Sequence, residues 1–144
     1  MSHRTGPRPP IVVSACLLGV RCNHRGAASP SPQAMRLADD FRIIAICPET
    51  VGGLPTPRAA AQRRPDGRVI ASDGSDVTAA YARGAAAAVE LARVTGARRA
   101  VLKARSPSCG CHQIYADERL VDGEGVTAQA LREAGLEVRS EEDL

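Results

Sequence analysis

The stretch Ile-Val-Val-Ser-Ala-Cys, residues 11–16, decides the fold, because it is a β-branched, almost continuously apolar run that ends at a cysteine. Such a run predicts a short strand that is buried on both faces. Residues 43–46 (Ile-Ile-Ala-Ile) form a second run of this kind, which ends at Cys47, and residues 100–102 form a third. The sequence therefore predicts a sheet whose strands are covered on both sides.

Helical segments are predicted between these strands. Ser31 is a suitable N-cap with Pro32 at the first helical position, and it predicts a helix that reaches about Asp40. The longest apolar stripe at helical spacing predicts a helix over residues 77–95, capped by Asp76 or Thr78 and terminated by Gly96. Further along, a short helix is predicted over residues 127–134 and a last strand over residues 136–138.

The alternation of strands and helices predicts an α/β fold, with a mostly parallel, Rossmann-like sheet in a single three-layer domain. With 144 residues the chain fits one compact domain. We predict an irregular, proline-containing lead-in over residues 1–10 and the α/β domain over residues 11–144. A Pro/Gly loop is predicted over residues 48–57, and a turn at residues 65–67 between two short extended segments.

The composition excludes several classes of protein. Aromatic residues make up 2% of the chain and the net charge is only +3, so a nucleic-acid-binding module that stacks bases on aromatic rings is disfavoured. No stretch approaches the roughly 20 apolar residues that span a bilayer. The expected partner is a small molecule and the expected compartment is the cytoplasm, where thiols stay reduced. The sequence does not specify an oligomeric state.

Five cysteines are present, and their spacing excludes the common metal knuckles. No C-x-x-C pair exists, so a zinc finger, a zinc ribbon or a redox C-x-x-C motif fits poorly. Cys16 and Cys47 directly follow predicted strands, and Cys109 comes seven residues after Leu102. Ligands of open α/β sheets sit off the carboxyl ends of the strands. We therefore expect these three cysteines to converge at one edge of the sheet.

A single buried cysteine is usually a small core residue, but three at strand ends are a candidate metal centre. Converging soft thiolates select iron–sulfur, zinc or copper(I) centres. Three ligands on a 4Fe-4S cluster leave one iron open, and an open iron can bind a sulfur atom of a substrate.

The motifs themselves resemble the 2-thiouracil desulfurase family, long catalogued as a domain of unknown function. The resemblance runs from Ile11 to the C-terminus in the order of the family. It is carried by SACLLG (14–19), CPETVGGLPTPR (47–58), DGSDVTAAYARGA (73–85), KARSPSCG (103–110), QIY (113–115), GEGVTAQALREAG (123–135) and SEED (140–143). Together these motifs are specific, whereas CPE or SCG alone is weak.

The resemblance implies a non-redox desulfurase that converts 2-thiouracil and water to uracil and hydrosulfide with a 4Fe-4S cluster. By position, Cys16, Cys47 and Cys109 match the cluster ligands of the family. Glu49 matches its catalytic carboxylate and Ser106 its catalytic serine. In this interpretation the open iron binds the thiocarbonyl sulfur, Glu49 takes a proton from the attacking water, and Ser106 orients that water or relays a proton.

This chain departs from the family pattern in two places that bear on the site. Asn23-His24-Arg25-Gly26 stands where the family has an aromatic and an acidic residue before glycine, which bears on the substrate pocket. Cys111 creates a C-x-C pair that the usual motif lacks, and it is a candidate fourth thiolate. Cys22 is predicted to be a thiol outside the ligand set, able to form a disulfide with Cys16 in cluster-free protein.

Two other functions remain open at this stage. One is a non-catalytic zinc or iron–sulfur protein in which Cys16, Cys47, Cys109 and Cys111 form a closed set of four ligands. The other is a metal-free enzyme with a cysteine nucleophile, which would need a partner base from only three histidines.

Overall fold

Four parallel strands form the central sheet of the computed structural model, which describes residues 7–116 and 119–144. These strands are β1 (Pro10–Ser14), β2 (Arg42–Ile46), β5 (Arg99–Leu102) and β8 (Glu137–Ser140). Their order across the sheet is β2-β1-β5-β8. In a sheet of this order the direction of winding changes between β1 and β5, and such a switch point is where α/β proteins bind their ligands.

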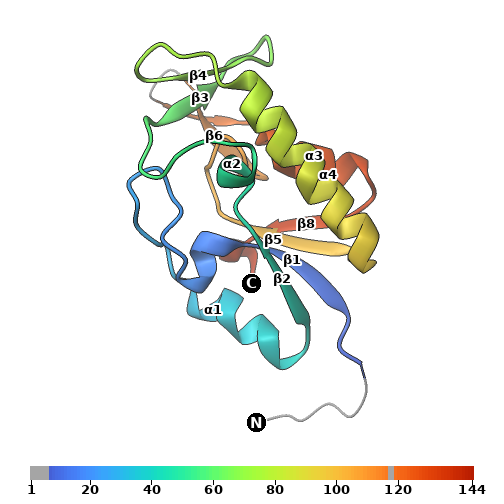
Figure 1. Cartoon of the computed structure of the whole chain (residues 1–144). Coiled ribbons are helices and arrows are strands. Elements are labelled where there is room, and N and C mark those ends of the chain that lie inside the picture. Colours follow the sequence, from blue (N-terminus) through green and yellow to red (C-terminus); the bar gives the residue numbers. More distant parts are fainter. Residues whose placement is uncertain (1–6, 117–118) are drawn as a thin grey trace.

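Helices cover both faces of this sheet (Figure 1). The helices α3 (Thr78–Thr95) and α4 (Val126–Glu133) contribute Ala88, Ala92, Ala128 and Leu131 to one apolar core. On the opposite face, α1 (Pro32–Met35) packs Ala34 against Val13 and other side chains of the sheet. The predicted α/β fold, with three layers and a mostly parallel sheet, is confirmed.

The local signals for helix ends were mostly correct. Ser31 caps α1, since its hydroxyl accepts a hydrogen bond from the Ala34 amide at 3.1 Å. The predicted helix up to Asp40 is instead the four-residue α1, followed by the 3₁₀ helix η2 (Arg36–Asp39). The N-cap residue of α3 is Val77. Asp76 lies one residue before the cap and accepts a hydrogen bond from the Thr78 amide.

Several segments differ from the sequence-based expectation. The strand before Cys16 ends at Ser14, and Cys16 lies in the 3₁₀ helix η1 (Ala15–Leu18). The predicted loop over residues 48–57 begins with a helical turn, α2 (Pro48–Val51), because proline is well suited to a first helical position. The predicted lead-in ends earlier than residue 10, since Pro10 already pairs with Arg42 in the sheet; residues 1–6 lie outside the described part.

Two hairpins stand beside the sheet. The first pairs β3 (Ala61–Arg63) with β4 (Val69–Ala71) around the predicted turn, and the second pairs β6 (Gln113–Ala116) with β7 (Arg119–Asp122). The second hairpin is not among the elements predicted from the sequence. Residues of β7 are exposed, so they lack the buried alternation that marks a strand in sequence. The chain ends in a further 3₁₀ helix, η3 (Glu141–Asp143).

Candidate active site at the carboxyl ends of the strands

The three cysteines predicted to converge do lie together. Cys16 is in η1 after β1, Cys47 follows β2 as the N-cap residue of α2, and Cys109 is in the loop after β5. Cys16 and Cys47 both lie near enough to raise the pKa of Cys109, and Cys47 likewise raises the pKa of Cys16. Because β2, β1 and β5 are adjacent parallel strands, their carboxyl ends meet at one edge, which is the physical cause of this convergence.

Cys22 joins these thiols, which agrees with the expectation that it lies close enough to Cys16 to form a disulfide. It is buried, and the Cys47 thiol donates to the Cys22 carbonyl oxygen at 3.6 Å. The thiol of Cys22 also lies close enough to Cys47 and Cys16 for their charges to interact. All of these cysteines are free thiols in the structure. We call Cys16, Cys22, Cys47 and Cys109 the four-thiol set.

Burial is the largest cause of the raised pKa of Cys16, Cys22 and Cys109. It raises the pKa of Cys16 to about 12, with Cys22 and Cys47 adding to the shift. The pKa of Cys22 rises to about 12 from burial and the neighbouring Cys47. Burial also raises the pKa of Cys109 to about 12, against a lowering effect of a hydrogen bond from Ser14. Because burial disfavours a free thiolate, a metal cation has to take the place of the proton when such a thiol becomes a ligand.

The loop that carries Cys109 is fixed by its own polar groups and by α4. The Ser106 hydroxyl oxygen accepts from the amides of Ser108 and Cys109 at 3.1 and 3.0 Å. The Ser108 carbonyl accepts from the Thr127 amide in the first turn of α4, and the two hydroxyls lie 2.9 Å apart. A Cβ on Gly125 would lie 2.4 Å from the Ser108 oxygen, so this close approach requires glycine. Ser106 thus has a clear structural role in presenting Cys109.

Glu49 lies in the first turn of α2 and faces the thiols, since its charge acts on Cys109. Two donors converge on its Oε1 atom: Arg58 Nε at 3.1 Å and the Tyr81 hydroxyl at 2.8 Å. The Arg58 side chain is 6% exposed and that of Glu49 17%. Burial, together with Glu49, raises the pKa of Tyr81 far above its usual range, so its hydroxyl remains a donor.

Arg58 connects this carboxylate to the thiols. One of its terminal nitrogens donates to the Cys22 carbonyl at 2.8 Å, and the other to the Pro55 carbonyl and the Thr56 hydroxyl. No role was predicted for Arg58, although it ends the CPETVGGLPTPR motif, or for Tyr81, which lies within the helix predicted over residues 77–95. The polar end of a tyrosine in an apolar stripe is the signal that could have pointed to a buried partner.

Cys111 is half-buried and follows Cys109 by two residues. Burial raises the pKa of its thiol to about 11, and the neighbouring carboxylates of Asp143, Glu141 and Glu124 add to the shift. The closed set of Cys16, Cys47, Cys109 and Cys111 stays an alternative for the metal experiments below.

The surroundings of the four-thiol set suit a sulfur-ligated centre. The Lys103 ammonium acts on Cys16 and pairs with Glu141 at 3.4 Å. An open cavity of about 430 Å³ borders the set at Cys22 and Cys47. Converging buried thiols with no disulfide between them fit the donor set of an iron–sulfur cluster or a zinc ion.

Comparison with known proteins decides the family. Residues 11–143, nearly the whole chain, match the family described as 2-thiouracil desulfurase.

The chain belongs to the 2-thiouracil desulfurase family.

Two known proteins are similar to this desulfurase-family chain over most of its length. A solved structure named 4Fe-4S-dependent thiouracil desulfidase TudS is 42% identical, with a TM-score of 0.88, and the match covers 95% of this chain and 93% of that one. A protein of Bacillus subtilis (strain 168) named Uncharacterized protein YbbK is 35% identical over 146 residues, which cover 93% of this chain and 97% of the relative. The family predicted from the sequence motifs is thus confirmed.

Proposed function

We propose that this chain removes sulfur from a thiolated pyrimidine, converting 2-thiouracil and water to uracil and hydrosulfide. The expected enzyme class, a thiouracil desulfurase, and the expected 4Fe-4S cofactor are confirmed by the family and by the solved relative. The observation that carries the finer proposal is the placement of Glu49 beside a set of converging, buried or half-buried thiols.

Cys16, Cys47 and Cys109 would hold the cluster, each from the end of a different sheet strand. When bound by three thiolates, the cluster supplies a Lewis-acidic iron with an open position, which polarises the thiocarbonyl group of the substrate. The assignment of three ligands rests on the positions of these cysteines in the family motifs. Cys22 is the neighbouring thiol that this assignment leaves outside the ligand set.

Glu49 is the proposed general base. The two donors Arg58 and Tyr81 both meet Oε1 of its carboxylate, and their hydrogen bonds hold the group in one orientation. A carboxylate oriented in this way can take the proton of a water molecule that attacks C2 of the pyrimidine. The proton is then available for the departing sulfur, so the reaction needs no oxidant or reductant.

Ser106 is proposed to act at the same place through its hydroxyl proton. Its oxygen already accepts two backbone hydrogen bonds, which fix its position next to Cys109. The O–H group remains able to donate to the attacking water. Ser106 therefore combines the structural role seen in the loop with the proposed orientation of water.

The proposed substrate is a small molecule, and the proposed compartment is the cytoplasm. In the described part of the chain, no helix is long and apolar enough to cross a membrane. The net charge of +3 does not favour a nucleic acid as substrate.

The deciding experiment is anaerobic reconstitution with iron and sulfide, followed by an assay for hydrosulfide released from 2-thiouracil. Glu49→Gln is expected to retain the cluster absorbance and to lower kcat by about 10²–10⁴. Glu90→Gln, on the exposed side of α3, is the matched control and should keep full turnover. Full turnover of a cluster-loaded Glu49→Gln variant would refute the assignment of the base.

The ligand set is tested separately with cysteine variants. Cys22→Ser and Cys111→Ser should retain the cluster, whereas serine at position 16, 47 or 109 should abolish or strongly reduce iron loading. If Cys22→Ser lost iron as completely as Cys16→Ser, the cluster would have four protein ligands and no open position. Zinc without acid-labile sulfide would instead support a non-catalytic metal protein.

A further inference from the structure

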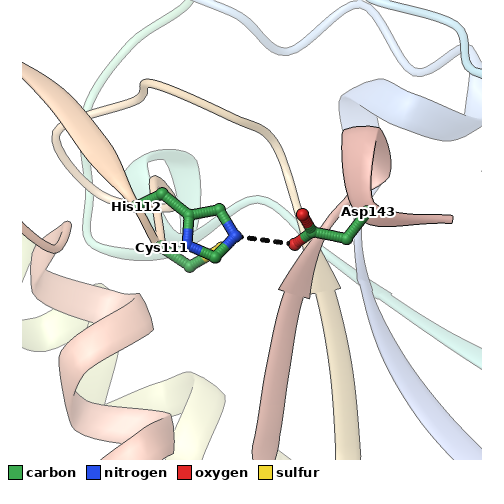
Figure 2. Close-up of side chains that lie close together, drawn as sticks. All are labelled: Cys111, His112 and Asp143. Carbon is green, nitrogen blue, oxygen red and sulfur yellow. Dashed lines mark hydrogen bonds and ion pairs between the residues drawn. The ribbon is translucent and has the colours of Figure 1, made fainter.

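Three metal-ligand side chains of different chemistry meet outside the four-thiol set. Cys111, His112 and Asp143 each offer one ligand atom, and these atoms lie within 4.8 Å of one another. Figure 2 shows the His112 ring directed at the Asp143 carboxylate, with Cys111 beside it. Nothing in the proposed desulfurase reaction uses these residues.

The two segments that carry these residues are each held by backbone hydrogen bonds. Cys111 and His112 lie between the Cys109 loop and β6, and the His112 carbonyl accepts from the Gly123 amide at 3.0 Å. Asp143 ends η3, where its Oδ2 accepts from the Ser140 amide at 2.8 Å. The three ligand atoms therefore come from two segments that are far apart in sequence.

The donor chemistry selects a borderline divalent metal. A thiolate, an imidazole and a carboxylate are the three ligand types of zinc, with bond lengths of about 2.0–2.3 Å. His112 Nε2 and Asp143 Oδ2 are joined by a hydrogen bond of 2.8 Å. If the two groups moved slightly apart, a metal ion would fit between Nε2 and Oδ2 in place of the proton of this hydrogen bond. Three protein ligands would leave a fourth position for water.

The surrounding charges also favour a cation. The carboxylates of Asp143, Glu141 and Glu124 act on the Cys111 thiol. Two of these carboxylates already pair with cations, Glu141 with Lys103 and Glu124 with Arg132. Asp143 instead accepts from His112 and from the Ser140 amide, so it is the carboxylate that supplies negative charge to an ion at this place.

We propose that Cys111, His112 and Asp143 form a second metal site that binds a zinc-like divalent ion, separate from the four-thiol set. Binding replaces the thiol proton of Cys111, which is released to solvent, and the His112 proton shifts from Nε2 to Nδ1 so that Nε2 is free to bind the ion; no electron transfer is involved. The ion joins the segment that follows Cys109 to the C-terminal turn. Because that turn also supplies Glu141, which accepts from the Ala104 amide at 2.7 Å, the site braces both ends of the Cys109 loop.

The test is equilibrium dialysis of cluster-loaded protein against Zn²⁺ under anaerobic, reducing conditions, with bound zinc measured by elemental analysis. Wild-type protein is expected to bind one equivalent of zinc more than each of Cys111→Ser, His112→Gln and Asp143→Asn. His24→Gln is the matched histidine control and should bind as much as wild type. Because the readout is a difference between variants, zinc taken up by the four-thiol set would add equally to all of them.

Two further measurements keep the proposal open to refutation. X-ray absorption at the zinc edge should show a single sulfur ligand with nitrogen and oxygen neighbours, and zinc should raise the Tm of wild type but not of His112→Gln. His112 is exposed, so this variant should fold. Asp143→Asn keeps an oxygen that can accept from Ser140, which separates loss of the ligand from loss of the cap. Equal zinc content in wild type and all three variants would overturn the proposal.

Discussion

At the scale of single residues, Arg58 connects the Glu49 carboxylate to the four-thiol set. It binds the Glu49 carboxylate on one side and the Cys22 carbonyl on the other, and its side chain is almost fully buried. A charged side chain is buried in this way only when its partners compensate for lost solvation. Arg58 is therefore a positioning residue, acting through Glu49.

Arg58→Gln is expected to lower the free energy of unfolding by about 3–5 kcal/mol, because it leaves the Glu49 carboxylate buried without its cation. Chemical denaturation measures this directly. Arg93→Gln provides the control, since Arg93 pairs with Glu90 on the solvent side of α3 and its loss should leave stability nearly unchanged. Similar stability of the two variants would contradict the role of the buried pair.

Tyr81→Phe removes the second donor to Glu49 while keeping the aromatic ring in the core. Hydrogen bonds to charged groups contribute about 1.5–3 kcal/mol. We expect the variant to fold, to retain iron, and to lose about tenfold or more in kcat with little change in KM, because Glu49 loses one of the contacts that orient it. Unchanged turnover of the iron-loaded variant would show that Arg58 alone orients the carboxylate.

At the scale of elements, the position of α2 depends on its contact with α3. A Cβ on Gly84 of α3 would lie 2.0 Å from the Pro48 oxygen, and a Cβ on Gly52 would lie 2.1 Å from the Ala80 oxygen. Backbone therefore meets backbone at this crossing. Since α2 carries Glu49 and begins at Cys47, the contact sets where both functional side chains lie relative to Tyr81.

Gly84→Ala is expected to push α2 away from α3 and to lower the free energy of unfolding by about 1–3 kcal/mol, despite the higher helix propensity of alanine. Iron loading and turnover should fall together, because Cys47 and Glu49 move with α2. Ala86→Ser, on the exposed side of the same helix, is the control. A Gly84→Ala variant with wild-type stability and activity would show that the contact between α2 and α3 can accommodate an added methyl group.

At the scale of the whole molecule, the carboxyl edge of the sheet gathers thiols that are protonated at neutral pH in the cluster-free state. The pKa of Cys16 rises from 9.0 to about 12 on folding. The folded state thus binds this proton more tightly than the unfolded state does. Its contribution to stability is fully present below pH 9 and is lost as the pH rises toward 12. Cluster assembly must displace such protons, so it is favoured by higher pH.

For reduced, cluster-free protein, the free energy of unfolding should fall between pH 8 and pH 10. Cys16 should account for about 1.4 kcal/mol of that fall, one pKa unit's worth, because the unfolded thiol ionises first. Urea denaturation of wild type and Cys16→Ala at both pH values isolates this part, since Tyr81 and the other thiols titrate in both proteins. Equal losses in the two proteins would contradict the buried, protonated thiol.

Much of this architecture was accessible from local sequence. The continuous aliphatic runs predicted β1, β2 and β5, and the parallel arrangement of such strands predicted that Cys16, Cys47 and Cys109 meet. Ser31, Pro32 and Gly96 marked helix ends because capping depends on one or two neighbouring backbone groups. The family and its motifs were also evident from the chain alone. The assignments of Glu49 and Ser106 as catalytic residues stay predictions.

Only the tertiary structure decided which side chains surround the site. Arg58 and Tyr81 meet on Glu49, and Arg58 also reaches the Cys22 carbonyl. The physical reason is that hydrophobic periodicity and capping report on contacts within a few residues, whereas these contacts join residues that are 9 to 36 positions apart. Where a loop turns back depends on packing against the whole sheet, which no local pattern in the sequence encodes.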